Sequence, residues 1–450
     1  MKLFYLSLIS AALISASAVI AQDSTVPART FTLQQALEAG LANSRELKIS
    51  RSKFTQSEAR LTETTSQLLP QLKFMAGYTR LSDVPPFEIT LPVPGLPVNH
   101  FRVSESIPDN YNLRLSLQQP VFTGFRLTSI RKAAAENRTA SEMDYSRDYN
   151  ESAFRIHSGF WQFYKAQQIL KSVNESLASS EKHLEDTRNF LEQGLVTQND
   201  LLKLEVQYSN TKLQQIEAAN NLEIARASFN QLIGLPLNEN TDISAPGIEP
   251  ASDSRSFQEY VSEAKTNRTE LKAMLHRLDA TGYNIDAAKA GWFPQIYLTG
   301  NYYYNRPNQR IQPPKDRFDD TWDIGVTLSW DIWNWGYTSA QTAQAEQTKV
   351  QTETGLAQLN ENIEIEVYQN YLSLQRAAER IAVSKKSLEQ SDENLRTLND
   401  KYNHQLATST DLIDAESLLL QAQTNYNTSL VDYQLALVRL QKSIGRKIYQ

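Results

Sequence analysis

Two carboxylates near the C-terminal end of the chain have a spacing that suits chemistry on one helix face. Asp411 and Asp414 stand three residues apart, so a helix would present both on the same side. If copies of the chain surrounded a common axis, these side chains would form two stacked acidic rings, which attract cations in pores. A structural interpretation of Asp411 also stays open, because an acid that follows Ser409 and Thr410 favours a helix N-terminus.

The remaining titratable residues do not form a pattern that predicts catalysis. The five histidines are scattered, without metal-ligand spacing or a neighbouring nucleophile motif: His100, His157, His183, His276 and His404. The chain has no Cys, which excludes thiol chemistry, disulfides and a lipidated N-terminal Cys. We therefore predict that the protein is not an enzyme and uses no cofactor or metal. The net charge of -6 and the absence of basic runs argue against nucleic acid as a partner.

The stretch Trp322–Trp335, WDIGVTLSWDIWNW, is the clearest structural signal among the elements that must position these residues. Apolar and polar residues alternate along it, which is typical of a β-strand with one apolar and one polar face. Trp on the apolar face and carboxylates on the polar face fit a membrane β-barrel strand, with lipid outside and water inside. The edge of a soluble β-sandwich is the other interpretation.

The first 21 residues have the features of a secretory signal peptide. Lys2 precedes an apolar run from Leu3 to Ile20, and small residues precede Gln22. After this segment no run of 18 apolar residues occurs, so a membrane location would require a barrel.

The rest of the chain is an internal duplication, with a first repeat at 22–236, a linker at 237–256 and a second repeat at 257–450. Pro70-Gln71 recurs as Pro294-Gln295, and Ile233-Gly234 recurs as Ile444-Gly445. In each repeat we expect a helix, a β-hairpin and a long helical hairpin. The β-hairpins are expected at 71–121 and 295–332, with strands near 71–80, 111–121, 295–304 and 322–332. Six prolines predict an irregular loop over residues 81–110.

The helical hairpins are expected to be very long. From Phe125 to about Phe190 the chain has no Pro, and Leu recurs every seven residues from Leu170, which predicts coiled-coil packing over about 100 Å. A shorter helix from about Asp200 to Leu232 returns antiparallel. The tips are expected near 194–200 and 405–411.

Four strands cannot close a membrane barrel, because the smallest known barrels have eight. A trimer would supply twelve strands around a water-filled interior, whereas a dimer would supply eight around a filled one. Four tryptophans fit two interfacial girdles: Trp322 near the loops, and Trp330, Trp333 and Trp335 near the long helix.

This organisation resembles the TolC-like outer membrane efflux proteins over nearly all of the mature chain. The resemblance rests on the duplication, on the junctions QPVFTGFR (Gln119–Arg126) and WDIWNWGY (Trp330–Tyr337), and on the tips EQGLVTQNDLL (Glu192–Leu202) and HQLATSTDLID (His404–Asp414). It implies a mainly α fold with a membrane β-barrel: a homotrimeric 12-stranded barrel in the outer membrane of a Gram-negative bacterium, continuous with a periplasmic α-helical tunnel.

The resemblance also implies a passive exit channel of a tripartite efflux or type I secretion system. Its partners would be outer-membrane lipid, a periplasmic adaptor and an inner-membrane pump of the RND or ABC type. The family's gate has Asp at the positions of Asp411 and Asp414. Tyr402 and Asp200 match a latch that holds the tips shut, although Ala407 stands where well-known members carry Arg.

The tips match the family's adaptor-docking surface. The matching residues are Gly194, Leu195, Val196 and Thr197 in the first tip, and Gln405, Leu406 and Thr408 in the second. Helix reversal alone would also explain the Gly and Thr residues. The alternative function is a periplasmic coiled-coil spacer without a pore, which would need no lipid-facing strands. A nutrient porin would need more strands and no long helices.

Overall fold

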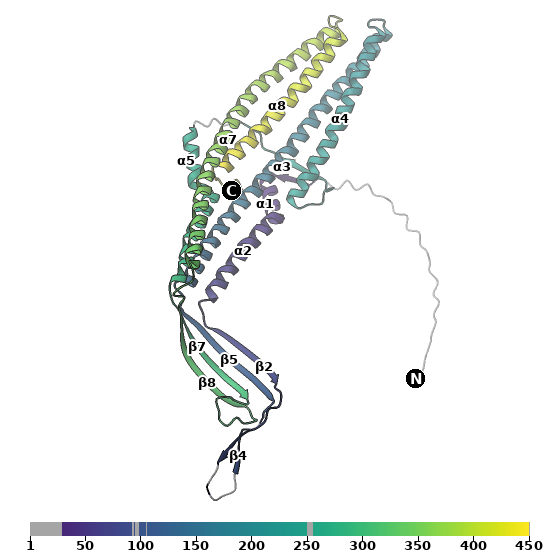
Figure 1. The fold of residues 1–450 in the computed structure, drawn as a ribbon. Helices are drawn as coiled ribbons and strands as arrows, with labels where there is room; N and C mark the ends of the chain where they lie inside the picture. The colour runs from purple at the N-terminus through teal and green to yellow at the C-terminus, as the bar shows by residue number, and fades with distance from the viewer. Residues whose placement is uncertain (1–28, 92–93, 95–98, 105, 250–254, 450) are drawn as a thin grey trace, which may run out of the picture.

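The computed structural model describes residues 29–91, 94, 99–104, 106–249 and 255–449. The predicted signal peptide therefore lies outside the described residues. The molecule is elongated, with long helices at one end and a β-sheet at the other (Figure 1). Helices make up most of the described chain, which confirms the predicted mainly α fold with added strands.

Both halves of the chain contain the same order of elements. The first half consists of α1 (Leu33–Asn43), α2 (Arg45–Ser66), β2 (Gln71–Arg80), β5 (Asp109–Phe122), α3 (Arg126–Glu192) and α4 (Gln198–Ile233). The second half consists of α5 (Phe257–Asn267), α6 (Thr269–Lys289), β7 (Gln295–Arg306), β8 (Asp319–Ser329), α7 (Tyr337–Asn403) and α8 (Ser409–Ser443). Helices α3 and α7 each have 67 residues, which corresponds to about 100 Å.

Side-chain caps set the starts of several helices. Thr32, Thr197, Ser256 and Thr408 each form a capping box with the residue three positions on. Ser44 separates α1 from α2, because its hydroxyl accepts a hydrogen bond from the N–H of Leu47 at 3.2 Å. The single helix expected at the start of the first repeat is therefore two helices.

The core lies where the short helices cover the long ones. Phe160, Phe163 and Phe229 belong to a cluster that α1 helps to cover in the first half. Tyr260 and Tyr433 belong to the corresponding cluster beneath α5 in the second half. Because aromatic side chains bury large apolar areas, these two clusters stabilise the packing of the helices in the middle of the molecule.

The predicted linker is partly ordered by strand pairing. Strand β1 (Arg29–Thr32) pairs in parallel with β6 (Thr241–Ser244), which lies inside the segment expected to be a linker. Asn230 at the end of α4 accepts a hydrogen bond from the Thr241 hydroxyl at 2.6 Å. Pairing between residues so far apart in sequence has no local signal, which explains why the sequence pattern does not reveal it.

The main sheet has the strand order β2-β5-β7-β8, with all neighbours antiparallel. Strands β5 and β7 join the two hairpins. Among the described residues, β2 and β8 pair on one side only, so both outer edges of the sheet are open.

An additional hairpin replaces the irregular loop expected over residues 81–110. Strand β3 (Phe87–Leu91) pairs antiparallel with β4 (Asn99–Ser104). The six prolines of this segment fall outside both strands, so each strand keeps its backbone donors. The longer loop of the first repeat thus contains a hairpin that extends beyond the sheet (Figure 1).

Among the described helices, none combines the length and the hydropathy needed to cross a membrane.

Candidate functional site

The two tips lie at the end of the helices farthest from the sheet (Figure 1). A hydrogen bond of 3.1 Å from Lys203 Nζ to the Thr410 hydroxyl joins one tip to the other. Gly194, Leu195 and Thr197 are exposed in the first tip, as are Gln405, Leu406 and Thr408 in the second, whereas Val196 is half-buried. Leu406 is 78% exposed, so this apolar side chain has no packing role within the chain.

A left-handed residue reverses the chain at each tip. Gly194 has φ 72° and Gln405 has φ 60°. The N–H of Leu195 donates to the carbonyl of Phe190 at 2.9 Å, and Leu406 makes the equivalent bond at 2.8 Å. Both reversals are αL caps of the kind that glycine favours. At Gln405 a Cβ atom makes this conformation less favourable by about 1 kcal/mol.

Asp200 and Asp411 help to cap the N-termini of the helices that follow the tips. The Thr408 hydroxyl and N–H donate to Asp411 Oδ2 at 2.6 and 2.9 Å. Thr197 binds Asp200 in the same way. The side-chain hydrogen bonds from Thr lower the pKa of both carboxyls. Asp411 thus has the structural role that the sequence leaves open, while its side chain remains exposed.

Asp414 is placed differently from Asp411. It is exposed one turn further along α8. Among the described residues it has no hydrogen-bond or ion-pair partner, and exposed Leu418 continues the same face. Its carboxylate is therefore available to ions or to another copy of the chain.

Among the described residues, Tyr402 forms no hydrogen bond with Asp200, its partner in the predicted latch. It is 3% exposed, and hydrogen bonds of 2.6 and 3.4 Å join its hydroxyl to Thr187 and Ser409. The Asp200 carboxylate is held instead by Thr197. An aromatic ring gains from burial between helices, so Tyr402 links the two helical hairpins of one chain.

A buried polar cluster connects the hairpins a few turns below the tips. Glu416 on α8 is 3% exposed and His183 on α3 is 4% exposed. His183 Nδ1 lies 2.6 Å from Glu416 Oε1, and the hydroxyls of Ser179 and Ser180 donate to the same carboxylate at 3.0 Å. Sequence reasoning does not find this cluster. The available signal is that Glu416 lies four residues after Leu412, on the buried side of α8.

The main sheet exposes one apolar face and one polar face. Exposed apolar side chains on one face include Leu72, Phe74, Trp322, Ile324 and Val326. The other face is polar and internally bonded, because Arg114 Nη2 donates to Asn301 Oδ1 and Asn301 Nδ2 donates to Asp323 Oδ1, both at 2.7 Å. An apolar face of this size on an isolated chain marks a surface that lipid or protein covers.

The tryptophans lie near the two ends of β8. Trp322 lies in the outer half of β8, and the strand ends at Ser329, earlier than the predicted end at 332. Trp330, Trp333 and Trp335 follow in the connection to α7, where Trp335 is 88% exposed. Positive φ angles at Trp335 and Gly336 turn the chain into α7.

Two long helices also carry exposed apolar stripes. On α4 the stripe consists of Leu202, Val206, Leu213 and Ile216, and on α7 of Ile365, Tyr368, Leu372 and Val383. Residues at such helical spacing ordinarily face a core. These stripes therefore provide surfaces against which helices of other copies could pack.

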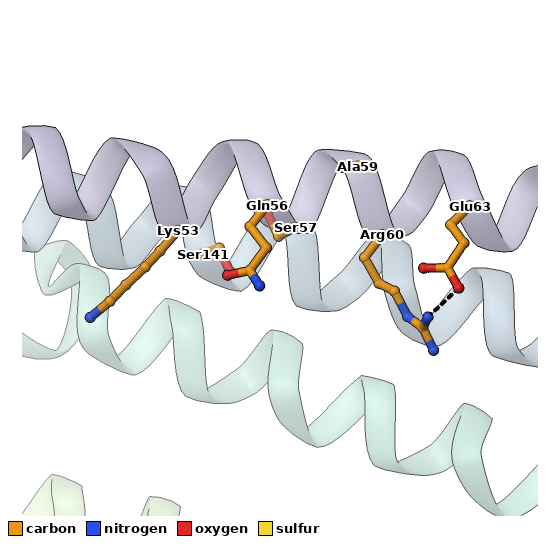
Figure 2. A pocket seen from close by; sticks show the side chains of 7 residues that line it. All are labelled: Lys53, Gln56, Ser57, Ala59, Arg60, Glu63 and Ser141. Carbon is orange, nitrogen blue, oxygen red and sulfur yellow. Dashed lines mark hydrogen bonds and ion pairs between the residues drawn. The ribbon is translucent and has the colours of Figure 1, made fainter.

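Open grooves along the helices do not have the features of an active site. Figure 2 shows one between α2 and α3, with a mostly polar lining that includes Lys53, Gln56, Arg60, Glu63 and Ser141. Its only drawn interaction is the Arg60–Glu63 ion pair within one helix. This arrangement provides a solvated helix surface rather than a catalytic group.

Among the residues that the structure describes, one group of side chains could hold a metal ion. Potential ligand atoms of Glu136, His276 and Asp279 lie within 4.8 Å of one another. In the structure His276 Nδ1 lies 2.7 Å from Glu136 Oε2. Sequence spacing does not reveal this group, because α3 contributes one member and α6 the other two.

Duplicated helical hairpins joined to a two-faced sheet define the class of outer-membrane exit channels. The outer membrane efflux protein family has a sequence profile that matches residues 36–235 and 260–446, so the chain belongs to that family.

Curated relatives cover most of the chain. The outer membrane protein TolC of Vibrio cholerae is 23% identical over 393 residues, which span 86% of this chain and 84% of the relative. The alkaline protease secretion protein AprF of Pseudomonas aeruginosa is 24% identical over 348 residues, which span 75% and 70%.

Solved structures share the fold. The Campylobacter jejuni CmeC outer membrane channel has a TM-score of 0.76 at 17% identity, over 92% of this chain and 85% of CmeC. The VceC outer membrane protein of Vibrio cholerae has the same score and identity, over 92% and 96%.

Proposed function

We propose that three copies of this chain form a passive outer-membrane exit channel for an efflux or type I secretion system. In this proposal the segment 1–21 directs export across the inner membrane. The channel performs no chemical reaction, and a pump in the inner membrane supplies the energy for transport.

The four-stranded sheet with two open edges carries the proposal. Unpaired strand edges cannot remain in lipid, since their backbone groups would have no hydrogen-bond partners. Pairing β8 of one copy with β2 of the next closes the sheet, and three copies give twelve strands around a water-filled lumen. The polar face of Arg114, Asn301 and Asp323 then faces the lumen, while Trp322, Trp330, Trp333 and Trp335 lie at the lipid interfaces.

The tips are the proposed gate and docking surface. Around a threefold axis, Asp411 and Asp414 form two acidic rings that favour cations. Exposed Leu195 and Leu406 offer apolar contacts to a periplasmic adaptor. The relative AprF is named for the secretion of an alkaline protease, which supports a place for this chain in an assembly that exports substrates.

Cysteine crosslinking in outer membranes tests the assembly, since the chain has no native Cys. We would replace Ala76 on β2 and Val326 on β8 by Cys in one chain and apply a short bis-maleimide. The proposal predicts covalent trimers. The matched control carries Leu115→Cys and Tyr302→Cys, which are register partners on the inner strands, and it should yield only internally linked monomers.

The spacer without a pore predicts a different result. Its sheet edges would not meet between copies, so the β2 and β8 pair would give no interchain product. Monomers alone from this pair, with efficient linking in the control, would contradict the channel.

A further inference from the structure

The connection between β7 and β8 folds back onto the polar face of the sheet. Asn308 is buried, and its Nδ2 donates to the Asp319 carbonyl at 3.0 Å and to the Thr321 hydroxyl at 3.2 Å. Asn308 Oδ1 accepts a hydrogen bond from the N–H of Arg310 at 3.0 Å. These bonds fix the start of the connection against β8, so its position is defined by contacts.

Arg310 is the side chain that this connection delivers to the polar face. Its Nη2 lies 2.5 Å from Asp323 Oδ2, and its Nη1 donates to the Trp322 carbonyl at 3.1 Å. Its guanidinium carbon is 5.0 Å from the centre of the Tyr303 ring. Tyr303 lies three residues before the end of β7 at Arg306, which is about 10 Å along the strand. Arg310 therefore reaches back over the sheet rather than away from it.

A second guanidinium meets the same tyrosine. Arg114 on β5 is the register partner of Tyr303, and its guanidinium carbon lies 5.5 Å from the ring centre. Arg114 Nε and Nη2 also donate to Asn301 Oδ1. Stacking on one aromatic ring and bonding to neighbouring polar groups hold both cations in place.

The charge of this band is positive. Lys73 on β2 lies on the same face, because it is the register partner of Ser116, whose hydroxyl also binds Asn301. Against Lys73, Arg114 and Arg310, the face carries the carboxylate of Asp323. Asp319 also lies on this face, but Arg317 neutralises it at 3.0 Å.

We propose that Arg114 and Arg310, held by Tyr303, Asn301 and Asp323, form an anion-binding band in the outer mouth of the channel. It would hold phosphate, sulfate or carboxylate groups of a substrate in transit, because guanidinium groups match these planar or tetrahedral anions. This inference rests on the proposed channel, in which the polar face lines the lumen and three bands form one ring.

The band would complement the acidic tips at the other end of the molecule. A substrate that carries both signs of charge would meet carboxylates first and guanidinium groups last. At the exit step the protein would thus favour substrates that carry an anionic group. The acidic tips alone would not select this class of substrate.

A side-specific block experiment tests the band. The channel is inserted into a planar bilayer from one chamber, and tripolyphosphate is titrated into the chamber that faces the barrel mouth or into the other. We expect stronger block from the barrel side. Replacing Arg310 by Ala in all three copies should raise the half-blocking concentration from that side at least about tenfold, because three charges act on a multivalent anion at short range.

Lys315→Ala is the matched control, because it removes from the same connection an exposed cation that has no ion-pair partner among the described residues. It should leave the barrel-side block within about twofold of wild type. Arg114→Gln should act like Arg310→Ala. Barrel-side block that is unchanged in both Arg310→Ala and Arg114→Gln would overturn the band. Absence of discrete wild-type conductance would instead overturn the proposed channel.

Discussion

Replacing Glu416 by Ala should favour the open arrangement of the tips. The change removes the carboxylate that binds His183, Ser179 and Ser180 between α8 and α3. It leaves an imidazole and two hydroxyls without their partner in a buried place. If the tips open by separating the two helical hairpins, this penalty falls on the closed state, because the separated side chains are solvated.

The size of the effect follows from burial. Leaving buried hydrogen-bonding groups without a partner costs about 1–3 kcal/mol, and each 1.4 kcal/mol is a factor of about ten. We therefore expect the ratio of open to closed channels to rise by about tenfold to a hundredfold in Glu416→Ala. Glu416→Gln keeps an acceptor oxygen and should give a smaller increase.

Open probability in planar bilayers at fixed voltage measures this ratio. Glu223→Ala is the control, because Glu223 is also ion-paired on a helix but is exposed, and such pairs contribute about 0–1 kcal/mol. An open probability of Glu416→Ala equal to that of wild type, in protein that still forms trimers, would refute the proposed role of the buried cluster.

The remaining predictions concern pH, the tips and docking. Burial lowers the pKa of His157 below its usual 6.5. The unfolded state therefore binds more protons, and the free energy of unfolding should decrease as pH falls below 6.5. Thermal unfolding at pH 5.5 and 7.5 should show this decrease in wild type but less of it in His157→Gln. Gln405→Gly should raise tip stability by about 1 kcal/mol and Gly194→Ala should lower it by a similar amount, because only glycine adopts positive φ without strain. Hydrogen exchange at the tips measures both effects. Equal exchange in the two variants would contradict this expectation. Changing Leu195 and Leu406 to Asn should reduce co-purification of the adaptor while conductance stays at the wild-type level; unchanged co-purification would reject these residues as docking contacts.

Features with a strong local period could be predicted from the sequence. The strand 71–80 was expected at the bounds that the structure gives to β2, and the absence of Pro after Phe125 indicated the long helix α3. At the tips, Thr as a possible cap and the acidic Asp411 after Thr410 indicated helix starts. These signals depend on residues close in sequence, so they can be interpreted without knowledge of the fold.

Features that depend on distant partners were missed. The β1–β6 pair joins segments about two hundred residues apart, and its strands are too short for a reliable period. The partner of Tyr402 depends on how two hairpins pack, so family resemblance suggested Asp200 whereas the chain provides Thr187. The return of Arg310 to Tyr303 depends on the path of a connection, which side-chain alternation does not encode.

Single-channel recording of wild type beside the double variant Asp411→Ala, Asp414→Ala tests the central claim most directly. We expect discrete, cation-selective conductance in wild type and a reversal potential that moves toward zero in the double variant, because both acidic rings are lost. Protein that is folded and inserted but gives no discrete conductance in either form would contradict the claim that this chain builds a channel.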